Sequence, residues 1–155
     1  MQKWTWFMVC LLFIGLDQAT KLWTLHCLDL YQSVAIFPGL HWTLVFNTGS
    51  AFGFLSHSGA WPQHLFTAFG LLMSLGLTFW IVKTPLKATR ELLALTLILS
   101  GALGNVIDRI RLGYVVDFID VYYKTHHWPV FNVADSAICV GAILLFFSTN
   151  NKNTD

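Results

Sequence analysis

The acidic residues of this chain are few, and they are the groups whose chemistry could define a site. Eight acids occur among 155 residues, and two of them, Asp117 and Asp120, lie in the stretch "GYVVDFID" (113–120). Two carboxylates held together can share a proton and activate water. Positions three apart share a face of a helix but lie on opposite faces of a strand. Because β-branched and aromatic residues surround the aspartates, a strand is favoured, and they are not expected to pair with each other.

Asp135 lies in "FNVADSA" (131–137), at the start of another apolar run. The helix dipole favours a carboxylate in a first turn, and in a soluble protein that would explain this residue. Here Asn132, Asp135 and Ser136 interrupt a stretch that is apolar enough to enter a membrane. Polar side chains in that setting favour a functional interpretation.

The composition predicts a membrane protein. Hydrophobic residues make up 55% of the chain and charged residues 11%, which lies outside the range of soluble globular proteins. The length predicts one domain over 1–155. A net charge of +1 without a basic run indicates no nucleic-acid partner. The three cysteines fit neither a disulfide framework nor a C-x-x-C metal pattern, and the scattered histidines indicate no metal site.

Four apolar stretches approach the ~20 residues that a helix needs to cross a bilayer. They cover about 4–25, 65–82, 92–107 and 131–147. The first could be a cleaved signal peptide, but no small-residue cleavage site follows it, and it contains Asp17 and Lys21. The sequence therefore predicts a bundle of four transmembrane helices.

The lysines and arginines predict the orientation of the bundle. None occurs from 22 to 82, whereas several lie beside the first span, in the 83–91 connection and after the last span: Lys3, Lys83, Lys87, Arg90 and Lys152. The positive-inside rule then places both termini in the cytoplasm and the segments 26–63 and 108–130 outside.

The outer segments are rich in strand-forming residues. "HWTLVF" (41–46) and "GYVVDFIDVYY" (113–123) predict strands, and "NTGSAFG" (47–53) predicts a turn. We expect a small sheet on the outer membrane surface. Aromatic side chains should lie at headgroup level, namely Trp42, Trp61, Tyr122, Tyr123 and Trp128.

This topology brings the strongest polar residues to one level near the outer leaflet. Asp17 and Lys21 are spaced i,i+4 with the acid first, which favours a structural ion pair over a catalytic role. Gly101 and Gly104 predict close helix packing. Arg109 predicts either a buried ion pair or a clamp on a ligand carbonyl or phosphate. Two alternatives to an enzyme are a transporter that uses these residues as a relay and a non-catalytic adaptor. A conduction path would, however, need polar residues through the full membrane thickness.

Four stretches, taken together and in this order, resemble the bacterial lipoprotein signal peptidases (signal peptidase II). They are "DQATK" (17–21), "FNTGSAFG" (46–53), "GALGNVIDRIRLGYVVDFID" (101–120) and "FNVADSA" (131–137). The resemblance implies an intramembrane aspartyl endopeptidase that frees the signal peptide of a prolipoprotein by cutting just before its diacylglyceryl cysteine. It also implies a fold of four helices with a small sheet and a short helical lid on the outer face.

Residue by residue, the resemblance implies that Asp117 and Asp135 form the catalytic dyad. It implies that a second group holds the substrate or supports the dyad: Asn47, Gly49, Asn105, Asp108, Arg109 and Asn132. Asp17, with Lys21, is expected to be structural. No metal or cofactor is expected. The resemblance further implies a monomer in the bacterial cytoplasmic (inner) membrane, contact with membrane lipid, and inhibition by cyclic peptides of the globomycin type.

Overall fold

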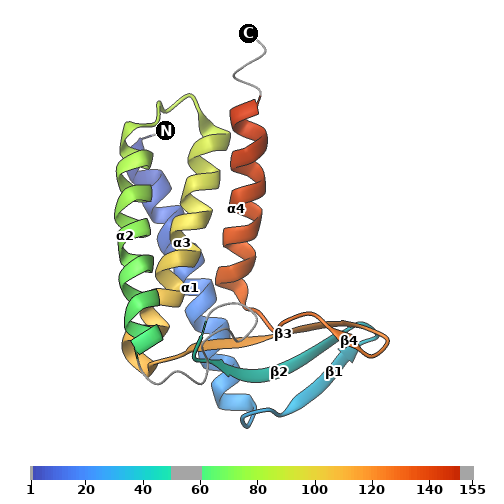
Figure 1. The fold of residues 1–155 in the computed structure, drawn as a ribbon. Helices are drawn as coiled ribbons and strands as arrows, with labels where there is room; N and C mark the ends of the chain where they lie inside the picture. The colour runs from blue at the N-terminus through green and yellow to red at the C-terminus, as the bar shows by residue number, and fades with distance from the viewer. Residues whose placement is uncertain (1, 50–60, 151–155) are drawn as a thin grey trace.

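The computed structural model describes residues 2–49 and 61–150 as four long helices and a small antiparallel sheet at one end (Figure 1). The helices are α1 (Lys3–Cys27), α2 (Trp61–Lys83), α3 (Thr89–Leu112) and α4 (Val133–Asn150). The strands are β1 (Ser33–Phe37), β2 (Leu40–Asn47), β3 (Val115–Tyr123) and β4 (His126–His127), paired in that order. The predicted fold class, an apolar four-helix bundle with a small sheet, is confirmed.

Three of the helices, α1, α2 and α3, are long and apolar enough to cross a membrane, and α4 is apolar over the shorter stretch Val133–Ser148. The start of α1, the α2–α3 connection and the end of α4 lie at the end of the bundle away from the sheet (Figure 1). This is the up-and-down arrangement that the positions of the lysines and arginines predicted.

The third helix runs further than the predicted stretch 92–107. It continues through Asp108 and Arg109 to Leu112, and it ends where Gly113 adopts a left-handed φ of 80°. Glycine takes this conformation without the steric cost that a Cβ imposes, so it is a common helix stop. The turn at Gly113 directs the chain into β3.

Both predicted strands are confirmed, since 41–46 lies within β2 and most of 113–123 forms β3. These strands pair antiparallel, with Val45 opposite Asp117 and His41 opposite Asp120. The strands β1 and β4 were not predicted. Among the described residues no helix accompanies α1 to α4, so the expected short outer helix is not found there; residues 50–53 of the predicted turn lie outside the described ranges.

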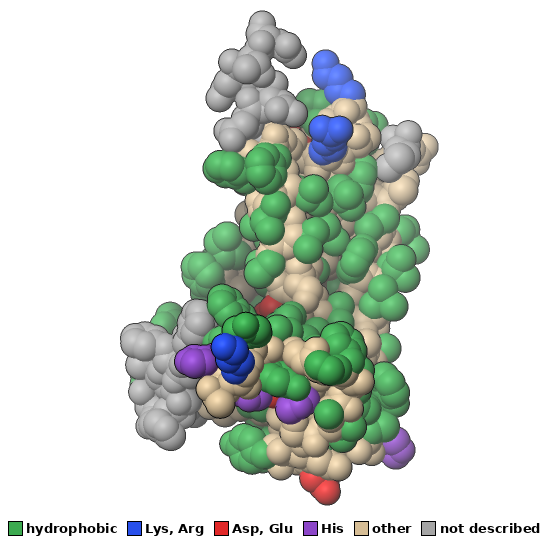
Figure 2. All heavy atoms as spheres, turned by 90° about the vertical axis from the view of Figure 1, so that its right-hand side faces the viewer, with side chains coloured by type: hydrophobic (Ala, Val, Ile, Leu, Met, Phe, Trp, Pro, Cys, Tyr) green, Lys and Arg blue, Asp and Glu red, His purple; other side chains and the backbone are tan. Residues whose placement is uncertain are grey.

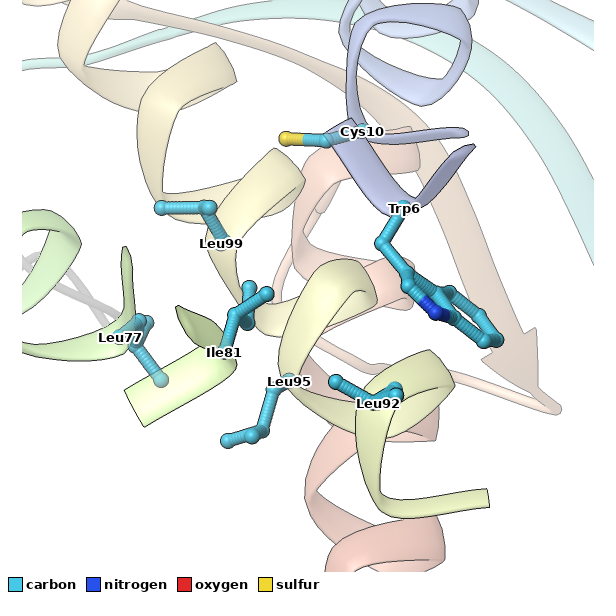
Figure 3. Packing of buried hydrophobic residues seen from close by; sticks show 7 residues of the cluster. All are labelled: Trp6, Cys10, Leu77, Ile81, Leu92, Leu95 and Leu99. Atoms are coloured by element: carbon cyan, nitrogen blue, oxygen red, sulfur yellow. The ribbon is translucent and has the colours of Figure 1, made fainter. Parts of the chain in front are cut away.

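The half of the bundle away from the sheet has an apolar core. Side chains from α1, α2 and α3 interlock there with almost no exposed surface (Figure 3): Trp6, Cys10, Leu77, Ile81, Leu92, Leu95 and Leu99. A second, smaller cluster of Leu28, Leu44 and Val116 packs the sheet against the ends of the helices.

The outer surface of the bundle is also apolar. Figure 2 shows hydrophobic side chains over the helical column, with lysine and arginine side chains near its two ends. Large exposed examples include Trp4, Phe69, Leu72 and Phe146. Of the aromatic residues predicted at headgroup level, Trp61, Tyr123 and Trp128 are exposed, whereas Trp42 and Tyr122 are half-buried in contacts of the sheet. A surface of this kind is suited to lipid contact.

Glycines let α3 and α4 approach closely, as predicted for Gly101 and Gly104. A Cβ on Gly101 would lie 2.2 Å from the carbonyl oxygen of Ala134, and one on Gly104 would lie 2.6 Å from Oδ2 of Asp17. Gly141 of α4 lies equally close to α3, where a Cβ would meet the carbonyl oxygen of Ala94 at 2.7 Å. Backbone contact of this kind requires residues without side chains.

We expect Gly101→Ala to destabilise the bundle by about 1–3 kcal/mol, because the added methyl group forces α4 away from α3. Gly76→Ala is the matched control, since a Cβ on Gly76 meets no atom within 4 Å, and alanine there should be neutral or slightly stabilising. Thermal unfolding of both variants in one detergent measures the difference. Equal melting temperatures would contradict the assigned packing.

Candidate active site

Two aspartates from different elements, the buried Asp117 and the half-buried Asp135, line one cavity at the junction of the bundle and the sheet. Asp117 comes from β3 and Asp135 from the first turn of α4. The cavity has a volume of about 540 Å³, and its wall combines polar side chains with an apolar surface: Asn47, Asn105, Arg109, Val115, Asp117, Trp128, Pro129, Val130, Phe131, Asp135, Ser136, Ile138, Cys139 and Val140. The structure thus brings together the two aspartates that the sequence placed 18 positions apart.

Asp117 is 2% exposed and accepts hydrogen bonds on both carboxylate oxygens. Asn47 Nδ2 donates to Oδ2 at 3.0 Å, and Asn132 Nδ2 donates to Oδ1 at 2.6 Å. Burial and the nearby Asp135 carboxylate raise the pKa of Asp117 to about 7, and the two amide donors only partly oppose them. Asp117 can therefore carry a proton near neutral pH.

Asn47 is held in the orientation that serves Asp117. Its Oδ1 accepts a hydrogen bond from the backbone N–H of Gly49 at 3.1 Å, so its Nδ2 faces the carboxylate. This side-chain-to-backbone turn accounts for the polar pattern at the start of "NTGSAFG".

Asp135 is held by the cap of its own helix. Its Oδ2 accepts from the backbone N–H of Asn132 at 3.2 Å, while Asn132 Oδ1 accepts from the backbone N–H of Asp135 at 2.9 Å. This reciprocal pair is the arrangement of a capping box, with asparagine and aspartate in its two positions. Because the Asn132 oxygen is occupied in the cap, the amide nitrogen is left to donate to Asp117. One residue therefore connects the two carboxylates.

Behind the two aspartates lies a buried ionic cluster centred on Lys21. The Lys21 ammonium is 2.9 Å from Asp17 Oδ2 and 2.9 Å from Asp108 Oδ2, and it donates to Asn105 Oδ1 at 3.0 Å. Asn105 Nδ2 in turn donates to Asp135 Oδ1 at 2.8 Å. The predicted ion pair of Asp17 and Lys21 is present, and it is part of a larger cluster that reaches the site.

The cluster also anchors the backbone of the neighbouring elements. Asp17 Oδ1 accepts from the N–H of Ala134 in α4, and Asp108 Oδ2 accepts from the N–H of Val116 in β3. Gln18, which the sequence reasoning did not single out, donates to Asp17, to Asp108 and to the carbonyl oxygen of Gly104. A third polar residue beside Asp17 in an apolar helix was the signal that could have identified it.

Arg109 faces the cavity and is half-buried. Its Nη1 makes only a long contact of 3.5 Å with the carbonyl oxygen of Asn105, and its guanidinium lies 5.7 Å from the centre of the Phe66 ring. Within the described part of the chain, its buried Nε has no hydrogen-bond partner. Of the two predicted roles, this geometry favours a clamp for an acceptor on a ligand, because buried N–H groups require partners.

Asp120 belongs to a different cluster on the other face of β3. It is 5% exposed and accepts from Thr43 Oγ1 at 3.2 Å, and its Oδ1 lies 2.7 Å from His127 Nδ1. His41 lies 3.9 Å away on β2. Asp117 and Asp120 therefore do not face one another, as the strand spacing predicted. Among the residues that the structure describes, this cluster and the cavity contain no group of three or more His, Cys, Asp or Glu arranged to hold a metal ion.

Comparison with known proteins places this arrangement in a family. Residues 9–150 match the sequence profile of signal peptidase II. A lipoprotein signal peptidase of Shewanella pealeana is 48% identical over 147 residues, which cover 95% of this chain and 85% of that protein. One of Acinetobacter baumannii is 49% identical over 144 residues, covering 93% and 82%.

Two solved structures of bacterial membrane enzymes have the same fold. One aligns with a TM-score of 0.87 at 29% identity, covering 97% of this chain and 90% of the other. The second aligns with a TM-score of 0.80 at 30% identity, covering 94% and 92%. Coverage of this extent includes all four helices and the sheet.

The raised pKa of Asp117 predicts how stability depends on pH. In the folded protein Asp117 keeps its proton up to about pH 7, whereas an unfolded chain releases it near 3.8. The folded state therefore binds more protons between these values, and its stability falls as pH rises through this range. Asp117→Asn removes the effect, which has an upper limit of about 4 kcal/mol. We expect the melting temperature of the variant, relative to that of the wild type at the same pH, to increase as pH is raised from about 5 to about 8. A difference that stays constant over this range would contradict the assignment.

Proposed function

This chain belongs to the signal peptidase II family, whose curated relatives are lipoprotein signal peptidases, and from this premise we propose that it is an intramembrane aspartyl endopeptidase. Its substrate is a prolipoprotein whose cysteine carries a diacylglyceryl group, and the enzyme cuts the peptide bond just before that cysteine. The observation that carries the proposal is that two carboxylates, the buried Asp117 and the half-buried Asp135, line one cavity with an apolar wall.

The electrostatics of the pair support a single shared proton. Two nearby carboxylates do not both ionise readily, and the pKa of Asp117, about 7, leaves the proton on that residue near neutral pH. Asp135 then acts as the ionised general base, supported by donors from Asn105 and the Asn132 backbone. Titration belongs to the pair as a whole, so both residues contribute to the pH profile of the reaction.

The reaction proceeds by attack of water on the scissile carbonyl carbon. Asp135 takes a proton from the water as its oxygen forms the new C–O bond, and Asp117 passes its proton to the carbonyl oxygen. The resulting diol collapses as the proton on Asp135 moves to the leaving nitrogen and the C–N bond breaks. One diol proton returns to Asp117, which restores the starting state. The products are the carboxyl end of the signal peptide and the free amine of the lipidated cysteine.

The other polar residues at the cavity hold the substrate and the dyad. Arg109 has N–H groups available for a carbonyl oxygen of the substrate backbone, and Asn47 and Asn132 keep Asp117 in place. Gly49 and Asp108 act indirectly: the Gly49 N–H orients Asn47, and Asp108 binds Lys21. The apolar wall along α4 suits acyl chains or the signal helix, and a cyclic lipopeptide of the globomycin type would compete for the same space.

The position of the site fits a substrate anchored in the outer leaflet. We place both termini and the α2–α3 connection in the cytoplasm because Lys3, Lys83, Lys87 and Arg90 gather at that end. The cavity then lies at the outer side of the bacterial cytoplasmic (inner) membrane, next to the bond to be cut and accessible to water. Every group in the proposed mechanism comes from one chain, so a monomer suffices. The apolar core between α1, α2 and α3 argues against a polar conduction path and therefore against a transporter.

Asp117→Asn and Asp135→Asn should each lower cleavage of a lipidated prolipoprotein at least ~10³-fold, because neither variant can shuttle the proton. Asp120→Asn is the matched control on the same strand. Its contacts with Thr43 and His127 lie outside the cavity, so it should keep most of the activity. Product release from purified enzyme in micelles measures all three, and thermal unfolding checks that each variant is folded. Full processing by a folded Asp117→Asn or Asp135→Asn variant would exclude the dyad, and ion flux without cleavage by the wild type would favour a transporter.

A further inference from the structure

We infer that Lys21 is a positioning residue of the dyad, which acts on Asp135 through the side-chain amide of Asn105. This inference rests on the proposed function. Lys21 does not line the cavity, so it neither touches the substrate nor takes part in proton transfer. Its influence on Asp135 is transmitted by one amide group that contacts the ammonium on one side and the Asp135 carboxylate on the other. Its positive charge also acts on Asp117 directly.

The three acceptors around Lys21 match its three N–H donors. They are Asp17 Oδ2, Asp108 Oδ2 and Asn105 Oδ1, all within 3.0 Å, and Lys21 is only 2% exposed. The two carboxylates already supply more negative charge than the ammonium needs for neutralisation. The third bond, to Asn105, is therefore not required by charge balance, and it has a consequence for the site.

That consequence is the orientation of the Asn105 amide. With Oδ1 directed at the ammonium, Nδ2 must face Asp135, to which it donates at 2.8 Å. A flipped amide would place its N–H groups against the ammonium and its oxygen against the carboxylate, and both contacts would be repulsive. Asn132 Nδ2 also donates to Asn105 Oδ1, at 3.2 Å, and Lys21 adds the shorter and charged bond at 3.0 Å. The positive charge of Lys21 therefore strengthens the amide rotamer that stabilises the ionised form of the general base.

Other charged groups also surround this path, and they come from four of the elements packed on it. Asp17 lies on α1, Asp108 and Arg109 on α3, Asp117 on β3 and Asp135 on α4, while α2 presents the Phe66 ring to Arg109. A purely structural ion cluster and a positioning role therefore differ in what they predict. Both affect stability, and in both the charge of Lys21 acts on Asp117 directly. Only the positioning role predicts that removing the Asn105 amide, with Lys21 in place, shifts the acidic limb of the pH profile.

The test compares pH profiles of kcat/KM for cleavage of a lipidated prolipoprotein peptide. Lys21→Met removes the charged one of the two donors that orient the amide. Asn105→Leu removes the amide itself and leaves the ion pairs of Lys21 with Asp17 and Asp108 in place. Each change removes a donor from an ionised carboxylate, so the acidic limb should move to higher pH by about 1 unit. Asp17→Asn is the matched control: it breaks an ion pair of the same length but keeps the bond from Lys21 to Asn105. It should lower the melting temperature without moving the limb to higher pH.

An acidic limb that stays at the wild-type pH in Asn105→Leu would overturn the inference, and so would an equal upward shift in Asp17→Asn. If Lys21→Met does not fold, Asn105→Leu and Asp17→Asn decide the question. The proposed function is tested separately. It is excluded if the wild type does not cleave the prolipoprotein peptide, or if Asp117→Asn and Asp135→Asn still cleave it. In that case an infrared titration without substrate still decides the inference. The protonated-carboxyl band that is missing in Asp135→Asn belongs to Asp135. As the pH is lowered, this band should appear at a higher pH in Asn105→Leu than in the wild type. The same pH in both proteins would overturn the inference.

Discussion

The structure depends on one constraint, which is that carboxylates buried in an apolar bundle must receive hydrogen-bond donors. Asp17, Asp108 and Asp117 are at most 2% exposed, and a charge without partners at such sites would be very costly. Each therefore accepts at least two N–H groups, and for each at least one of these comes from an element that is not adjacent in the chain order. The donors of Lys21, the asparagine amides and the backbone of α4 and β3 fix how the helices and the sheet meet. The same bonds that stabilise the junction also shape the cavity.

The bundle is divided into an apolar half and a polar half. The interlocked side chains of α1, α2 and α3 away from the sheet are mostly aliphatic, and they stabilise the bundle without contributing to chemistry. The residues of the site and of the Lys21 cluster gather where the helices meet the sheet. There Gly101 allows close contact with the Ala134 backbone, and Gly104 with the Asp17 side chain. In the proposed reaction this division confines water and proton transfer to one side of the membrane.

Three asparagines perform the same task at three positions around the dyad. In Asn47, Asn105 and Asn132 the amide oxygen is occupied by a donor, namely the Gly49 N–H, Lys21 and the Asp135 N–H. Each amide nitrogen is thereby directed at Asp117 or Asp135. A neutral amide that is held at both ends can orient a carboxylate without adding charge, which leaves the dyad free to share a single proton.

The sequence by itself determined the membrane class, the four apolar helices, the two central strands and the separation of Asp117 from Asp120. These features follow from local composition and from the periodicity of side chains along helices and strands, and neither depends on distant segments of the chain. Family motifs also identified the residues expected at the site, apart from Gln18. Only the tertiary structure decided that Lys21 contacts Asn105 and that Asp120 is bonded to His127. It also decided that the buried Nε of Arg109 has no partner among the described residues. It also decided the later end of α3, the edge strands β1 and β4, and the pairing of Asp117 with Asp135 in one cavity. These contacts join residues from different elements, and their geometry is set by how the helices and strands pack rather than by any local pattern.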